Sequence, residues 1–119
     1  MSSNYAKVKS FPIHRVGEDK FSEYDWEEVP DGLAWFVYAY ERGSYEGYGA
    51  AAFKTTDGKY GSANLGHCSC YGPTDRFDIS NTTDLSGLLK ELETKPEDYD
   101  FTYQSAVRAK VMELEGVKQ

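Results

Sequence analysis

This sequence has few of the features that mark secreted, membrane-spanning or nucleic-acid-binding proteins. Its 119 residues include two cysteines, Cys68 and Cys70, which stand too close together to staple a fold as the disulfides of a secreted domain do. No stretch approaches the ~20 apolar residues of a membrane span, and the first ten residues contain no apolar core of a secretion signal. We therefore expect a cytoplasmic protein with no membrane partner.

Positive charge is also scarce. There are 13 Lys and Arg against 20 Asp and Glu, for a net charge of -7. Because nucleic-acid binding draws most of its affinity from Lys and Arg, this balance argues against direct contact with nucleic acid and favours a partner protein with a basic surface. Residues 18–31 carry seven of the acids and one lysine. A solvated face that keeps the protein soluble is the simpler interpretation of such a run.

The length and composition fit one domain with one core. Hydrophobic residues make up 39% of the chain and charged residues 28%, which is typical of a globular protein. Aromatic residues reach 15%, so much of the core must be aromatic. We divide the chain into an irregular acidic lead-in (1–31), a β-meander (33–66), a loop (67–80) and two helices (81–116).

Three segments have the pattern of strands joined by short turns. Residues 33–41 are aromatic and β-branched, and residues 48–54 and 59–65 flank a hairpin turn at Asp57-Gly58. The small residues in the middle of the second and third strands predict a helix or an aromatic ring lying close on the sheet. Residues 11–16 are predicted to form a short edge strand. Strict alternation in the first strand predicts one face with Leu33, Trp35 and Val37 and another with Phe36, Tyr38 and Tyr40.

Residues 84–93 and 102–115 have the periodicity of helices, with residues 81–83 as the cap of the first and Gly116 as the end of the second. Gly87 inside the first helix costs about 1 kcal/mol relative to Ala, unless close packing against the small residues of the strands explains it. The predicted fold class is α+β, a three-stranded antiparallel meander, or four-stranded with the edge strand, and two C-terminal helices packed on it. The apolar stripes are Leu85, Leu88, Leu89 and Leu92, then Tyr103, Val107, Val111 and Leu114.

One loop is dense in side chains that bind metal. His67, Cys68 and Cys70 lie within four residues, and zinc prefers thiolate and imidazole ligands. His14, or a carboxylate, would complete a tetrahedral set. Against this, zinc knuckles usually contain Cys-x2-Cys, and a buried turn with inert cysteines is the simpler interpretation. A metal- or small-ligand-binding module centred on this loop, with zinc as the ion, is an alternative function.

The spacing of Cys70 and Arg76 matches a phosphate-binding loop around a nucleophilic thiolate. However, Pro73 removes one of the backbone amides that such a loop uses, and no helix is predicted to start at Arg76. Nothing in the sequence orients a base beside either cysteine. We therefore predict no enzymatic activity.

Tyrosines are concentrated in and beside the predicted meander. A tyrosine supplies a large, rigid contact area at protein interfaces, although about half of these belong to the core by the same pattern. We predict that the acidic segment supplies charge to a partner and that aromatic residues anchor it. The predicted partner-binding residues are Glu23, Tyr24, Asp25, Trp26, Glu27, Glu28, Tyr45 and Tyr48.

The stretch from Tyr45 to Gly72 contains a Tyr-Glu-Gly-x-Gly-x-Ala strand, an Asp-Gly-Lys-Tyr turn and a Gly-His-Cys-Ser-Cys-Tyr-Gly loop. It resembles small uncharacterised proteins encoded by bacteriophages and prophages. The resemblance implies a phage accessory protein in the cytoplasm of a bacterial host, and small acidic proteins in that setting often block host machinery. The expected function is protein binding, as an acidic inhibitor of a host or defence protein that grips nucleic acid. A structural protein of the virion is a further alternative.

Overall fold

Four strands form one sheet in the computed structural model of this chain, which describes residues 9–21, 26–27, 29–43, 46–66, 79–93 and 101–117. The strands lie in the sheet in their sequence order. They are β1 (Ile13–Arg15), β2 (Leu33–Arg42), β3 (Gly47–Thr55) and β4 (Tyr60–Asn64). With two helices added, the α+β class is confirmed, and β1 is the edge strand expected at residues 11–16.

The sheet is mixed, which corrects the expectation of a purely antiparallel one. β2, β3 and β4 form the predicted antiparallel meander, but β1 pairs with β2 in parallel, with Ile13 opposite Phe36. A parallel pair needs a connection of roughly a dozen residues or more, because the chain must return to the end of the sheet from which it started. Residues 16–32 provide this length, whereas the short turns after β2 and β3 give antiparallel neighbours.

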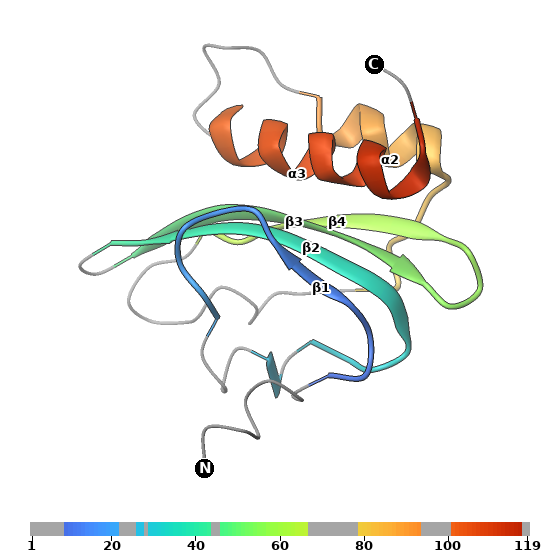
Figure 1. Cartoon of the computed structure of the whole chain (residues 1–119), viewed down its shortest axis with the longest axis horizontal. Coiled ribbons are helices and arrows are strands. Elements are labelled where there is room, and N and C mark those ends of the chain that lie inside the picture. The colour runs from blue at the N-terminus through green and yellow to red at the C-terminus, as the bar shows by residue number, and fades with distance from the viewer. Residues whose placement is uncertain are drawn as a thin grey trace.

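Two helices cover one face of the sheet, as predicted (Figure 1). α3 (Phe101–Glu115) lies across β2 and β3, and α2 (Leu85–Glu91) lies beside β4. The N-cap of α2 is Asp84, whose side chain accepts a hydrogen bond from the backbone N–H of Gly87, rather than a residue of 81–83. Gly116 follows α3 with a φ of 70°, which confirms it as the end of that helix. Of the helices in the described residues, none has the length and apolar character needed to cross a membrane.

The small residues of the central strands let α3 approach the sheet. Ala39, Ala50 and Ala52 are buried against Val107 and Val111 of α3. This confirms the expectation that a helix lies close on these strands. Gly87 of α2 has a different cause from the one predicted: an added Cβ would lie 2.2 Å from Thr83 Oγ1, so the turn before the helix requires the glycine.

Described residues of the segment before β2 pack on the other face of the sheet. Phe21 is fully buried and stacks on Tyr38 with 4.2 Å between ring centroids, and Trp26 meets the same ring edge-on at 5.6 Å. The described part of the predicted lead-in is therefore a third layer. Leu33 belongs to this aromatic face and not to that of Trp35, because the pairing of β2 with β3 shifts register between Leu33 and Trp35.

Gly61 of β4 leaves room for a buried aromatic ring. A Cβ added there would lie 2.4 Å from Cζ of Phe53. We expect Gly61→Ala to lower the free energy of unfolding by about 1–3 kcal/mol through overpacking, measured by urea denaturation. In a Phe53→Leu background the same substitution should cost clearly less, because the ring is gone. Equal losses in both backgrounds would show that this contact does not require the glycine.

Candidate functional site

The end of the sheet at which β2 passes into β3 carries a pocket of about 230 Å³. Its walls come from the residues after β1, the end of β2 and the first two turns of α3. Val16, Ala39 and Ala106 make the walls partly apolar, while Glu18 and Glu41 contribute exposed carboxylates. Among the described residues that line the pocket there is no Lys, Arg or His.

Glu41 is held in position from α3. The Tyr103 hydroxyl donates a hydrogen bond to Oε1 of Glu41 over 2.6 Å. Tyr103 lies on the predicted apolar stripe of α3 and packs partly on the helix-side core, so its ring is fixed while its hydroxyl reaches the end of the sheet. A carboxylate accepts several hydrogen bonds, and Glu41 therefore keeps the capacity to accept a further donor from a ligand.

Tyr48 extends this polar group along β3. It stands directly opposite Glu41 in the antiparallel ladder, which places both side chains on one face. Tyr48 is half-buried, and its hydroxyl donates to a carboxylate oxygen of Glu46. We call Glu18, Glu41, Glu46 and Tyr48 the acidic end. Tyr48 is one of the partner-binding residues predicted from sequence, and that role stays a prediction.

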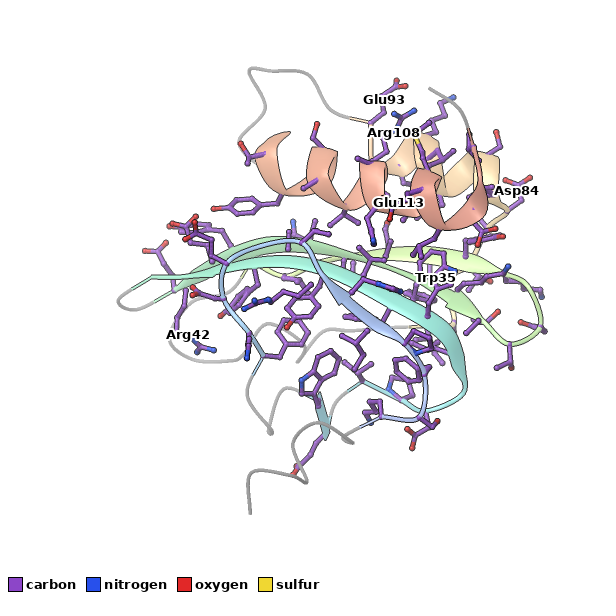
Figure 2. All side chains as sticks on the ribbon, viewed as in Figure 1. Trp35, Arg42, Asp84, Glu93, Arg108 and Glu113 are labelled. Carbon is purple, nitrogen blue, oxygen red and sulfur yellow. The ribbon has the colours of Figure 1, made fainter. Side chains whose placement is uncertain are left out.

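Two arginines near the acidic end lie on the opposite face of the sheet. The guanidinium of Arg42 sits 5.3 Å from the centroid of the Tyr40 ring, in the aromatic layer, and Figure 2 shows Arg42 on the side of the sheet away from the helices. Arg15 shares the face of Ile13 by alternation, and its Nη1 donates to the backbone carbonyl of Glu18 over 2.9 Å. The guanidinium of Arg42 therefore lies on the face away from the helices, whereas that of Arg15 reaches the backbone of Glu18.

The structure describes three of the eight residues predicted to bind a partner: Trp26, Glu27 and Tyr48. Trp26 is buried against Phe21, Phe36 and Tyr38, so it anchors its own segment to the sheet and we assign it no partner contact. Glu27 beside it is exposed. The remaining predicted contact residues lie outside the described residues: Glu23, Tyr24, Asp25, Glu28 and Tyr45.

His14, the candidate fourth zinc ligand, lies on β1 next to α3. Burial lowers the pKa of its imidazole, the charge of Lys110 lowers it further, and Glu113 opposes both. No group of three or more His, Cys, Asp or Glu that could hold a metal ion occurs within the described ranges. His67, Cys68, Cys70 and Arg76 lie outside those ranges, so the zinc site and the thiolate loop stay predictions.

A second polar cluster joins the end of α3 to the sheet. Glu115 accepts hydrogen bonds from Tyr60 Oη at 2.6 Å, from Trp35 Nε1 at 3.1 Å and from Lys54 Nζ at 3.5 Å. Burial raises the pKa of the Glu115 carboxyl, but the hydrogen bonds from Tyr60 and Trp35 and the charge of Lys54 outweigh it, so the pKa lies below its ordinary value. Each of these groups is used in holding the helix on the strands, which indicates a structural cluster.

No family model, no curated protein and no solved structure matches this chain. The resemblance of the Tyr45–Gly72 stretch to phage and prophage proteins therefore stays a prediction.

Proposed function

We propose that this protein acts by binding a basic partner protein through the acidic end. The supporting observation is that Glu18 and Glu41, from two separate segments, line one pocket that has no basic residue among its described lining. Glu46 accepts from Tyr48, which stands opposite Glu41. Arg42 lies on the other face, against the Tyr40 ring, and the guanidinium of Arg15 donates to the backbone carbonyl of Glu18. Opposite charge speeds the encounter of two proteins and fixes their orientation, so a basic surface is the complementary partner.

The proposed partner is a host or defence protein that grips nucleic acid, in the bacterial cytoplasm that the phage resemblance implies. A surface that holds phosphates is lined with Lys and Arg. Carboxylates held at one end of a folded sheet offer such a surface an alternative set of anions. On this proposal the protein inhibits by occupying the groove, and the net charge of -7 keeps it from binding nucleic acid itself.

The test compares two variants that remove the same charge from different places. Glu18→Gln/Glu41→Gln alters the pocket, and Glu91→Gln/Glu93→Gln alters exposed carboxylates at the end of α2. The immobilised protein is used to capture partners from a bacterial lysate at low salt, and the captured protein is then purified for titration. We expect the pocket variant to bind it roughly tenfold more weakly and the control variant to bind as the wild type does.

Salt gives a second measurement on the same pair. Affinity of the wild type should fall steeply as ionic strength rises, because exposed charges are screened beyond about 10 Å at 0.1 M salt. Equal affinity of the pocket variant and the control, or an affinity that is flat with salt, contradicts the proposal.

A third variant tests the acidic segment, residues 18–31, that was predicted from sequence to contact the partner. Neutralising Glu23, Asp25, Glu27 and Glu28 together should weaken the same complex and reduce its salt dependence, if these acids contact the partner. An unchanged affinity removes this segment from the interface and leaves the acidic end as the contact.

A further inference from the structure

The pocket at the acidic end has the size of a site for one side chain. Its volume of about 230 Å³ lies below the roughly 300–1,000 Å³ of ordinary small-molecule sites. Ala39 is almost fully buried, whereas Glu18 and Glu41 are exposed. The apolar wall is therefore the deeper part of the pocket, and the carboxylates stand nearer to solvent.

A side chain with an apolar stem and a cationic head matches a pocket whose apolar wall is deep and whose carboxylates stand nearer to solvent. Lys and Arg side chains lay an aliphatic stem along apolar surface and keep the charged head at the rim. Arginine fits two carboxylates better than lysine, because its planar guanidinium presents five N–H donors and is less strongly hydrated. Val16 and Ala106 would contact the stem, and Glu18 and Glu41 would accept from the guanidinium.

The start of α3 opposes a cation here but is the weaker influence. Thr102 and Tyr103 of its first turn line the pocket, and a helix N-terminus carries about half a positive charge. No acidic residue in that first turn offsets it. The guanidinium of Arg15, which donates to the backbone carbonyl of Glu18, is a second opposing charge. Two full carboxylates outweigh the helix end and this one cation together, and the Tyr103 hydroxyl is already donating to Glu41.

We infer that the pocket receives the side chain of one arginine from the partner, with its guanidinium on Glu18 and Glu41 and its stem against Val16 and Ala106. The inference rests on the proposed function, since that arginine belongs to the basic partner bound at the acidic end. It adds a specific anchor to what is otherwise general charge attraction.

Backbone amide NMR of the whole chain tests this with small probes. N-acetylarginine amide should shift the amides that line the pocket, at residues 16–18, 39–41 and 102–106. N-acetylcitrulline amide, which has the same shape without the charge, should bind at least about tenfold more weakly. Ala106→Leu fills the pocket and should abolish the shifts, and Glu41→Gln should weaken them. Shifts elsewhere, no shifts, or equal binding of citrulline overturns the inference.

The same variants separate this inference from the proposed function. If Glu18→Gln/Glu41→Gln weakens the partner complex while a folded Ala106→Leu does not, charge attraction stands and the arginine pocket is wrong. If neither variant affects the complex, both are wrong. If Ala106→Leu fails to fold, the arginine and citrulline titrations of the wild type and of Glu41→Gln still decide.

Discussion

Phe21→Ala should lower the free energy of unfolding by about 3–5 kcal/mol, a large part of the roughly 5–15 kcal/mol that holds a domain of this size together. Phe21 is fully buried and its ring meets those of Trp26, Tyr38 and Tyr40 at centroid distances of 4.9, 4.2 and 5.7 Å. Removing it opens a cavity between the sheet and the segment that covers it. Urea denaturation followed by tryptophan fluorescence measures the loss.

The controls for this variant come from the same segment. Phe21→Leu keeps most of the apolar volume and should cost clearly less than the alanine variant. Lys20→Ala changes an exposed neighbour and should leave the unfolding midpoint nearly unchanged. If Phe21→Ala costs less than about 1 kcal/mol, the segment before β2 does not form a layer of the core.

This layer was the part of the fold least accessible from sequence. The periodic stripes of the two helices and the turn residues of the meander are local signals, and they placed these elements within a few residues of their bounds. Phe21 and Trp26 stand in a run of charged residues without periodicity, so composition predicted a solvated lead-in. Each ring is buried by the aromatic face of β2, which is a long-range contact that no local pattern records.

The local sequence pattern also could not predict the direction of β1 or the face of the sheet on which Leu33 lies. The short β1 has three residues, and its pairing gives the same hydrophobic pattern in either direction. Residues 16–32 are long enough to permit a parallel pair but do not require one. Leu33 changed face because alternation holds only while the register is unbroken, and a shift between Leu33 and Trp35 is set by pairing with β3.

The acidic end shows the same limit for the candidate site. Counting acids along the chain singled out residues 18–31 as one block. In the fold, Glu18 at the start of that block lines a pocket with Glu41 from the end of β2. Tyr48 was predicted for its tyrosine side chain, and the ladder places it opposite Glu41. In the sequence, the acidic end is signalled only by the polar residues that stand at the ends of two apolar strands.

Glu115→Gln should lower the free energy of unfolding by about 2 kcal/mol, although it changes neither the size nor the shape of the side chain. Tyr60 donates to Oε1 of Glu115, and Trp35 and Lys54 both donate to Oε2. A glutamine is uncharged and has one acceptor oxygen and one NH₂ group. If its oxygen stays on Trp35 and Lys54, its NH₂ group faces the Tyr60 hydroxyl, which must then accept and loses the acceptor for its own proton, while Lys54 loses its counter-charge. Trp35 and Tyr60 are buried and water cannot easily replace the lost acceptor. Thermal and urea denaturation measure the effect.

Glu113→Gln is the matched control for this variant. Glu113 lies two residues earlier on α3, is exposed, and pairs with Lys110 within one turn of the helix. An exposed pair of this kind contributes little to stability, so we expect the midpoint to stay close to that of the wild type. Equal losses for the two variants would mean that the Glu115 cluster does not hold α3 to the sheet.

The pH dependence of stability shows whether Glu115 stabilises the fold through its charge or only through its shape. Its pKa in the folded protein lies below the ordinary 4.5, so the folded chain binds fewer protons in that range than the unfolded chain. The stability it contributes is present above 4.5 and is lost as pH falls through the lower, folded value. Glu115→Gln should therefore flatten the acid side of the stability curve.

The pKa of Glu113 is lowered as well, by Lys110, but that exposed pair is screened by salt. At high salt the flattening should persist for Glu115→Gln alone. A curve that keeps the wild-type slope would show that this partly buried carboxyl is not charged in the folded protein.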